Sequence, residues 1–269
     1  MSTVSVICSV KNGESIIEET IQSIQHQTFQ DWEFIIVDDG STDDTKKIVS
    51  KYISEDNRIR LIPTEGIGRA EALNLAVSHA NGEYIANIDA DDPSHPMRIQ
   101  YQYQAFQEYP DYALVAADYI LILDEQKVDW PQVEEKLNIT PLNQQLPYYN
   151  PIHHSSVMMQ RAALIKAGSY NTGLSSLLDY ELWVRLASNH YKLGKLTLPL
   201  SSKRIHSNQS FENKKRMKYL MQSFRIQQMA IKSLKGSLPA TISMYLRFLY
   251  GILPQRLRVS IKNIVIART

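Results

Sequence analysis

The first 120 residues alternate short apolar runs with segments whose apolar residues recur at helical spacing. The apolar runs at residues 4–10, 33–37, 60–62 and 83–88 are typical of buried strands. Helical patterns lie between them, and in the third of these Leu73, Ala76 and Val77 share one face. Strands that alternate with helices form parallel sheets covered on both faces. We therefore expect an α/β fold with a mostly parallel sheet flanked by helices.

Carboxylates gather directly after two of these predicted strands. Asp38 and Asp39 follow the second strand, and Asp89 and Asp91 follow the fourth. Parallel sheets bind ligands at the carboxyl ends of their strands, so the two acidic ends predict one binding site at that edge. For the first pair, capping of the helix that follows is the alternative, because an acidic group complements the positive end of a helix dipole.

Asp89 and Asp91 are the sharpest chemical signal. In an extended segment alternate residues share a face, so both carboxylates point the same way. Such a pair repels unless a cation lies between its members, and Mg²⁺ or Mn²⁺ would satisfy it while keeping positions for diphosphate oxygens. A solvated acidic turn is the alternative. For Asp92, directly before Pro93, we favour capping of the helix expected at residues 93–109.

From about residue 111 the pattern becomes mixed. Strands are expected at residues 113–117, 119–123 and 155–159, and helices at residues 161–167 and 179–187, with a polar stretch at 124–151. The pattern divides the chain into residues 1–118, a mixed half of the same domain at 119–210, and a helical region at 211–269.

Cysteine content and terminal composition suggest a compartment. The chain has one cysteine, which excludes an internal disulfide framework and fits a reducing environment. Cys8 lies in an apolar run and is expected to be a small buried side chain. Neither a secretory signal nor a long apolar span is visible, so we expect a cytoplasmic protein.

Charge is distributed unevenly along the chain. Residues 1–200 hold 15 Lys and Arg against 27 Asp and Glu, whereas residues 201–269 hold 14 Lys and Arg against one acid, Glu212. The tail mixes these charges with apolar residues, which is typical of a segment that lies in an anionic membrane interface. We therefore expect peripheral contact with the inner face of a membrane. Packing on the acidic body or an oligomer contact is the alternative, and no nucleic-acid-binding motif accompanies the charge.

Five motifs stand in the order and spacing of a known family. They are VSVI with NGE, QTFQDWEFIIVDDGSTDDT, ALNLAVSHANGEYIANIDADD, HHSSVMMQRAALIKAGSYN and LLDYELWVRLA, and they cover about residues 3–206. With them the chain resembles glycosyltransferase family 2, whose members have the GT-A (Rossmann-like) fold. The resemblance implies a metal-dependent inverting transferase that moves a sugar from a nucleotide-diphosphate donor, expected to be a UDP-sugar, to an acceptor hydroxyl. It implies Mn²⁺ or Mg²⁺ as cofactor, and a saccharide or lipid-linked acceptor in surface polysaccharide or glycolipid synthesis.

The resemblance also assigns roles to individual residues. Residues 1–118 become the nucleotide-sugar-binding half and residues 119–210 the acceptor-binding half. The residues implied to bind the donor are Ser9, Lys11, Asp39, Arg69 and Asp89. Asp89 and Asp91 match the DxD element of the family, with Asp91 the more direct metal ligand. Lys11 stands where many relatives have an aromatic side chain that stacks on the base, which leaves the nucleotide open.

Asp179 matches the catalytic base of the family. Direct displacement at the anomeric carbon needs a carboxylate that takes the proton of the acceptor hydroxyl, which agrees with this assignment. Asp179 can also serve as the N-cap of the helix that begins there, and the two roles are compatible. Glu181, two residues later on the same helix, faces away and is the weaker candidate.

Two histidine positions complete the candidate site. His153 and His154 precede a predicted strand where the family often places acceptor-side residues, and we select His154 for substrate binding. A hydrogen-bonded structural histidine is the alternative. His206 matches a late histidine of the family near the donor phosphates or the metal.

Two other classes of protein compete with this interpretation. A nucleotidyltransferase would carry a glycine-rich basic loop after the first strand, but CSVKNGES has one glycine there. A non-catalytic sugar-nucleotide-binding or scaffold protein of the same fold is the main alternative, although the chain keeps all the carboxylates just described. The sequence does not reveal which sugar, acceptor or linkage is involved.

Overall fold

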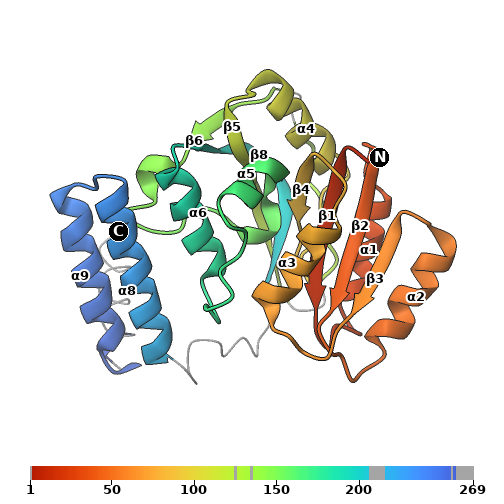
Figure 1. Ribbon diagram of the computed structural model, residues 1–269, viewed down its shortest axis with the longest axis horizontal. Coiled ribbons are helices and arrows are strands. Elements are labelled where there is room, and N and C mark those ends of the chain that lie inside the picture. Colours follow the sequence, from red (N-terminus) through yellow and green to blue (C-terminus); the bar gives the residue numbers. More distant parts are fainter. Residues whose placement is uncertain (1, 124–125, 134–135, 206–215, 256, 259–269) are drawn as a thin grey trace.

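The protein forms one sheet with helices on both faces and a helical hairpin at one side (Figure 1). The computed structural model describes residues 2–123, 126–133, 136–205, 216–255 and 257–258. Its strands are β1 (Val4–Val10), β2 (Trp32–Asp38), β3 (Ile59–Pro63), β4 (Tyr84–Asn87), β5 (Tyr112–Leu123), β6 (Ile139–Pro141), β7 (Met158–Gln160) and β8 (Lys192–Ile205). Its α-helices are α1 (Ile17–Gln25), α2 (Thr45–Glu55), α3 (Arg69–His79), α4 (Arg98–Glu108), α5 (Arg161–Lys166), α6 (Leu178–Ser188), α8 (Arg216–Ser233) and α9 (Leu238–Ile252), with 3-10 turns at Asn143–Gln145 and His154–Ser156.

The described strands follow the order β3-β2-β1-β4-β7-β5-β8-β6. The first four are mutually parallel, as the alternation of strands and helices predicted. β7 pairs antiparallel with both β4 and β5, and β8 pairs parallel with β5. The predicted α/β fold with a mostly parallel sheet and a mixed second half is therefore confirmed.

Several boundaries differ from the sequence prediction. The two strands expected at residues 113–117 and 119–123 are one strand, β5, whose register with β8 shifts around Asp118. The strand expected from residue 155 begins only at Met158, because a 3-10 turn precedes it. β8 was not predicted, although Leu196, Leu198 and Leu200 alternate with less buried residues in the manner of a strand.

The core lies on both faces of the sheet. On one face Ile7 and Ile35 pack with α3, α5 and α6, and on the other Cys8 and Ile36 pack with α1, α2 and α4. Alternate residues of β1 and β2 thus enter different layers, which a strand covered on both faces requires. Cys8 is fully buried as expected, and burial raises the pKa of its thiol.

The C-terminal helices form an antiparallel hairpin beside α6 (Figure 1). α8 packs on the body through Ile226 and Ala230, which belong to the core, and through Gln227, whose amide donates to the carbonyls of Pro147 and Tyr148. α9 lies against α8 on the outside. The expectation that the basic tail is helical is correct for the described part, and its inner helix packs on the body.

A buried arginine joins the elements that carry the acidic strand end. Arg98 is 1% exposed, and it donates to the carbonyls of Asn87 and Val157 at 2.7 and 3.0 Å. It also donates to Ser94 and Gln102. Burial lowers the pKa of Arg98 to about 9, so the guanidinium still carries its charge at neutral pH. The guanidinium therefore connects the ends of β4 and β7 with α4, directly behind the segment that holds Asp89 and Asp91.

We expect Arg98→Met to lower the free energy of unfolding by about 3 kcal/mol, because four buried oxygens lose a charged donor. Chemical denaturation followed by circular dichroism measures the loss. The matched control is Lys47→Met, whose exposed ion pair with Asp44 is expected to contribute less than about 1 kcal/mol. Equal stabilities of the two variants would contradict this role of Arg98.

Candidate active site

A cavity of about 860 Å³ opens at the carboxyl ends of β1, β2 and β4. The sequence analysis selected eight described residues for the site, and all of them line this cavity: Ser9, Lys11, Asp39, Arg69, Asp89, Asp91, His154 and Asp179. They come from segments up to 170 residues apart in the sequence. The acidic strand ends predicted a binding site at this edge of the sheet, and a ligand-sized cavity lies there.

An arginine, a carboxylate and a histidine form the centre of the cavity. Arg69, the first residue of α3, donates to the Asp89 carboxylate at 2.6 Å and lies 3.2 Å from Nδ1 of His154. The amide of Asn87 also lies 3.1 Å from that Nδ1. Nδ1 also lies 3.5 Å from the Asp89 carboxylate, and Nε2 lies within hydrogen-bond distance of the Tyr170 hydroxyl, at 3.0 Å. His154 is thus a hydrogen-bonded histidine that is also exposed to the cavity.

The charges of this centre are fixed by their neighbours. Burial by itself raises the pKa of the Asp89 carboxyl, but the Arg69 guanidinium together with His154 and His153 outweighs burial, and the pKa lies well below its usual range. Asp89 in turn raises the pKa of Arg69. Burial raises the pKa of the Tyr170 hydroxyl, so Tyr170 stays neutral. The centre therefore holds an ionised pair at neutral pH.

Asp38 and Asp39 have different local roles. Asp38 accepts from the Ser41 amide at 2.7 Å, which closes a turn before α2. Asp39 accepts from the Thr64 hydroxyl and from the amides of Ile67 and Gly68, so its carboxylate holds the loop that leads into α3. Asp39 is 7% exposed and lines the cavity, so it both organises the loop that delivers Arg69 and borders the expected nucleobase position.

A glycine allows this loop to approach the strand end. Gly40 has φ of +77°, a conformation that side-chain-bearing residues seldom adopt. A Cβ on Gly40 would lie 2.9 Å from the Gly66 amide nitrogen, closer than such atoms pack. A Cβ on Gly66 would lie 3.4 Å from Nζ of Lys11, so the Lys11 ammonium reaches this loop beside Asp39. Because Gly40 and Gly66 have no side chains, the loop lies close to the end of β2 at this part of the cavity.

The expectation that Asp92 caps a helix is wrong. α4 begins at Arg98, well after Pro93, and no side chain caps it. Asp92 instead accepts from the backbone amide of Arg204 in β8 at 2.8 Å, and its other oxygen lies 3.2 Å from Nε2 of His153. The segment after Asp92 pairs with β8 through the bridge from Ser94, which holds it extended rather than helical. Asp92 is thus a structural link between the acidic strand end and β8.

Asp179 points into the cavity without capping its helix. It is the second residue of α6, whose N-cap is Leu177 with φ of +55°, and no side chain caps this helix. The Asp179 carboxylate accepts from the Asn150 amide at 2.7 Å. Glu181 is bound to Arg185 at 2.8 Å, away from the cavity, as expected for the weaker candidate. A half-buried carboxylate held by one amide is suited to accept a proton from a bound hydroxyl.

The carboxylates fit a divalent cation that is shared with a substrate. Among the described residues, no three His, Cys, Asp or Glu side chains group closely enough to hold a metal by themselves. Asp89 and Asp91 both line the cavity, and Mg²⁺ is commonly held by one or two carboxylates together with substrate phosphates. His206, the third expected ligand, lies outside the described residues; Lys203 and Arg204, near the end of β8, line the cavity.

Sequence reasoning missed several residues of the cavity. Asn150 lies in a polar stretch and no motif marks it. Lys203 comes from the strand that was not predicted, and its ammonium lies 5.7 Å from the ring centre of Tyr119. Tyr219 of α8 brings the C-terminal hairpin to the cavity. The alternating leucines of β8 could have placed Lys203, whereas Asn150 and Tyr219 depend on tertiary packing.

Comparison with known proteins identifies the family. The family described as Glycosyl transferase family 2 matches residues 5–168, more than half of the chain. The chain belongs to glycosyl transferase family 2. The matched segment contains the ends of β1, β2 and β4 and His154, so the family assignment covers this part of the cavity.

Relatives among known proteins are named as glycosyltransferases. EpsE of Bacillus subtilis, provisionally assigned as a glycosyltransferase, is 32% identical over 193 residues, which cover 70% of this chain and 68% of that protein. The O-antigen biosynthesis glycosyltransferase WbnJ of Escherichia coli is 29% identical and is covered to 81%, against 77% of this chain. With the family match, these relatives show that the protein is a glycosyltransferase.

Solved structures of other transferases share the fold. TarS of S. aureus in complex with UDP-GlcNAc has a TM-score of 0.69 and 20% identity, with 93% of this chain and 72% of that chain covered. The mannosyltransferase PcManGT of Pyrobaculum calidifontis in complex with GDP-Man and Mn²⁺ has a TM-score of 0.62 and 19% identity, covering 93% and 81%. At this identity the likeness concerns the fold, which is the GT-A-like arrangement expected from the sequence.

Proposed function

We propose that this glycosyltransferase moves a sugar from a UDP-sugar to an acceptor hydroxyl with inversion at the anomeric carbon. The observation that carries the proposal is that one cavity joins Asp39, the Asp89–Asp91 pair and Asp179. Inversion by a single displacement needs a base on the acceptor side and a stabilised leaving group on the donor side. The chain supplies a carboxylate for the first task and a cationic and acidic centre for the second.

On the donor side, the base and ribose would lie against Ser9, Lys11 and Asp39 at the ends of β1 and β2. Arg69 would lie near the diphosphate, where a guanidinium matches the geometry of phosphate oxygens. TarS, which shares the fold, is known in complex with UDP-GlcNAc, and this supports uridine as the base. Residues 1–118 would then form the nucleotide-sugar-binding half and residues 119–210 the acceptor-binding half.

Asp91, with Asp89 and His206, would hold Mn²⁺ or Mg²⁺. The ion would stabilise the negative charge of the departing nucleoside diphosphate. PcManGT, of the same fold, is known with GDP-Man and Mn²⁺, and this supports a divalent ion in the proposal. We assign direct contact with the ion to Asp91, as the resemblance to the DxD element of the family implies, and Asp89 keeps its ion pair with Arg69.

On the acceptor side, Asp179 would take the proton from the attacking hydroxyl while Asn150 keeps its carboxylate in position. His154 would contact the substrate from the floor of the cavity, since its ring borders both Arg69 and the open space. WbnJ is named for O-antigen biosynthesis, which supports a saccharide acceptor of a surface polysaccharide or glycolipid.

A nucleotide-sugar panel tests the donor assignment. A ligand that binds only the native state at a hundredfold excess over its Kd adds about 2.7 kcal/mol of stability. We expect UDP-sugars with Mn²⁺ to raise the melting temperature by several degrees, and GDP-, dTDP- and CMP-sugars to raise it much less. A larger shift with another base, or the same shift with EDTA as with Mn²⁺, would contradict the uridine or metal assignment, respectively.

The alternative is a non-catalytic protein that binds the sugar nucleotide. It predicts the same thermal shifts but no consumption of the donor. Measurement of donor hydrolysis and transfer with Mn²⁺ separates the two, because an intact base and metal site turn the donor over and a binding protein does not.

A further inference from the structure

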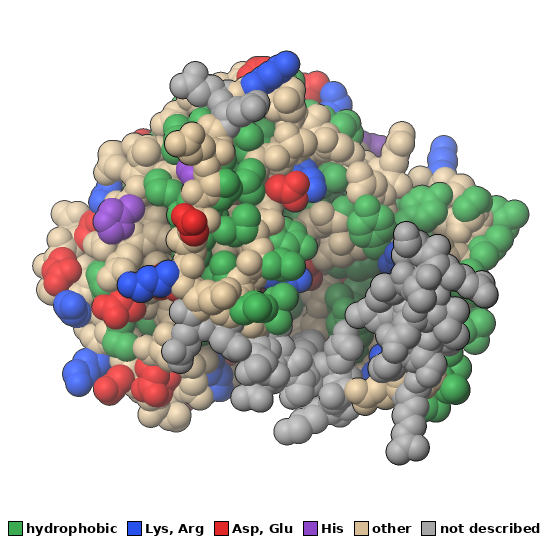
Figure 2. All heavy atoms as spheres, turned by 180° about the vertical axis from the view of Figure 1, so that it is seen from behind, with side chains coloured by type: hydrophobic (Ala, Val, Ile, Leu, Met, Phe, Trp, Pro, Cys, Tyr) green, Lys and Arg blue, Asp and Glu red, His purple; other side chains and the backbone are tan. Residues whose placement is uncertain are grey.

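The outer face of α9 is apolar and exposed. Its large side chains recur at spacings of three, four and seven residues, which places them on one side of a helix. They are Leu238, Ile242, Tyr245, Leu246, Leu249 and Ile252, with Leu246 60% and Leu249 58% exposed. Figure 2 shows hydrophobic side chains gathered along the edge of the molecule where this hairpin lies. We call this set of six residues the α9 face.

The α9 face is not needed to hold the hairpin together. The opposite side of α9 buries Ala240, Met244 and Gly251, and a Cβ on Gly251 would lie 2.5 Å from a methyl group of Leu220 in α8. Phe224 of α8 packs on the Phe248 ring and also contacts the ring of Tyr245, which lies at the border of the α9 face. Because the helices are already in contact along this inner side, the outer leucines remain available for another surface.

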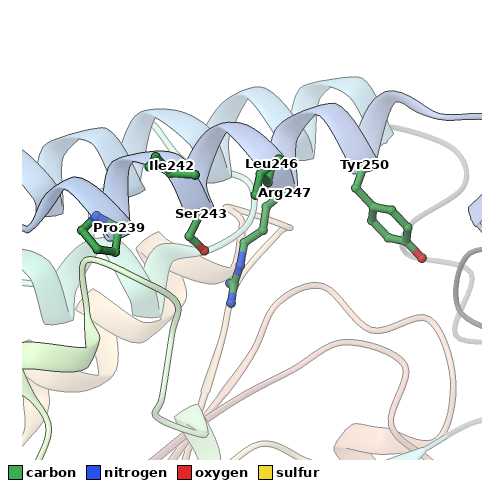
Figure 3. A pocket seen from close by; sticks show the side chains of 6 residues that line it. All are labelled: Pro239, Ile242, Ser243, Leu246, Arg247 and Tyr250. Carbon is green, nitrogen blue, oxygen red and sulfur yellow. The ribbon is translucent and has the colours of Figure 1, made fainter. Parts of the chain in front are cut away.

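Part of the α9 face borders a shallow hollow of about 460 Å³ (Figure 3). Its lining is apolar except for Ser243 and Arg247, and the Arg247 side chain extends away from the helix in Figure 3. Arg247 lies 5.7 Å from the ring centre of Tyr149. A long cationic side chain beside an apolar face can cover hydrocarbon with its stem and keep its charge at a polar boundary.

The charge around the α9 face has one sign. Residues 213–269 contain no Asp or Glu, so every charged side chain of the hairpin is a Lys or an Arg. Described examples on α8 are Arg216, Lys218 and Arg225, all without an acidic neighbour on their own helix. A second copy docked through the same face would bring two such regions together, which like-charge repulsion opposes. An anionic lipid surface offers both the apolar layer and the opposite charge.

We infer that the α9 face docks this glycosyltransferase on an anionic membrane and presents its cavity to a lipid-linked acceptor. The hairpin reaches the cavity: Tyr219 of α8 lines it, and Arg216, one turn earlier, donates to the Gly251 carbonyl at the end of α9. The docking surface and the acceptor entrance therefore share one end of the hairpin. The acceptor class depends on the proposed function, whereas the docking itself does not.

The test is cosedimentation of the full-length protein with vesicles of phosphatidylcholine containing phosphatidylglycerol, compared with phosphatidylcholine alone. We expect binding to the anionic vesicles that weakens at high salt, because the attraction between the basic side chains and the lipid charge is screened. Leu246→Glu with Leu249→Glu is expected to reduce the partition coefficient at least about tenfold, since two exposed leucines that would insert into the lipid are replaced by charges.

A matched control makes the same charge change on the body. Leu121→Glu with Ile165→Glu replaces two residues that are 61% and 48% exposed, so we expect vesicle binding within about twofold of wild type. Equal loss in both variants, or no binding to anionic vesicles, would overturn the docking. A dimer in light scattering that Leu246→Glu with Leu249→Glu converts to a monomer would also overturn it, since a second copy then covers the face.

Donor turnover in solution separates this inference from the proposed function. The variant with Leu246→Glu and Leu249→Glu should hydrolyse a soluble nucleotide sugar at the wild-type rate, because neither residue lines the cavity. Transfer to a lipid-linked acceptor in vesicles should fall with vesicle binding. Normal vesicle binding without any donor turnover would overturn the proposed function and leave the docking intact.

Discussion

Asp179→Asn is expected to lower kcat for sugar transfer by about 10²–10⁴-fold, the range lost when a general base is removed. The amide is similar in size to the carboxylate but cannot take the proton of the acceptor hydroxyl. Donor binding should persist, because Asp179 lies on the acceptor side and its protein partner is Asn150, at 2.7 Å. Steady-state transfer rates and the thermal shift with UDP-sugar and Mn²⁺ measure the two effects separately.

The control for this experiment is Asp111→Asn, the same chemical change at an exposed carboxylate outside the cavity. Asp111 pairs with Lys192 on the surface, and such pairs contribute little to stability. Transfer by this variant should match the wild type. If Asp179→Asn retained wild-type kcat, or if it abolished the donor-induced thermal shift, Asp179 would not be the base that the proposed mechanism requires.

Asp91→Asn is expected to reduce transfer by about 10²–10³-fold at saturating donor, a loss of roughly 3–4 kcal/mol of transition-state stabilisation. The physical reason is the loss of an anionic oxygen that would contact the ion beside the diphosphate. The additional thermal shift that Mn²⁺ gives to bound UDP should also disappear. Titration of Mn²⁺ in both assays measures the change in apparent metal affinity.

Asp89→Asn provides the comparison for this prediction. Asp89 accepts from Arg69 at 2.6 Å, so its replacement leaves a cation of the cavity without its ion-pair partner. We expect Asp89→Asn to lower the melting temperature of the unliganded protein more than Asp91→Asn does. A Mn²⁺ response that survives in Asp91→Asn and is lost only in Asp89→Asn would move direct metal contact to Asp89.

The hydrophobic pattern was sufficient to predict the four parallel strands of the N-terminal half. β1 has the predicted bounds, and β2, β3 and β4 differ from prediction by one residue at each end. These strands consist mostly of apolar residues and lie between segments of helical spacing. In β1, β2 and β4 the local pattern agrees with burial on both faces. The sheet rule then placed Asp39 and Asp89 at one edge without knowledge of any contact.

The structure that follows β4 depended on tertiary contacts. Asp92 looked like a helix cap, but pairing with β8 offered its carboxylate the Arg204 amide and held the segment extended. A single sequence does not show that Asp92 binds β8 instead of capping a helix, because Arg204 is 112 residues away. The 3-10 turn at His154–Ser156 likewise took the place of the first residues of an expected strand, and this turn places His154 beside Arg69.

The sequence by itself determined the sheet, its acidic edge and the positive tail, since these follow from periodicity and charge within short segments. Only the tertiary structure decided that Asn150 holds Asp179, that Tyr219 closes one side of the cavity, and that α8 packs inward while α9 exposes its leucines. Both helices are apolar and basic, so composition cannot choose between them. The difference comes from tertiary contacts: Ile226 and Ala230 of α8 fit the core beside α6, whereas α9 packs on the outer side of α8.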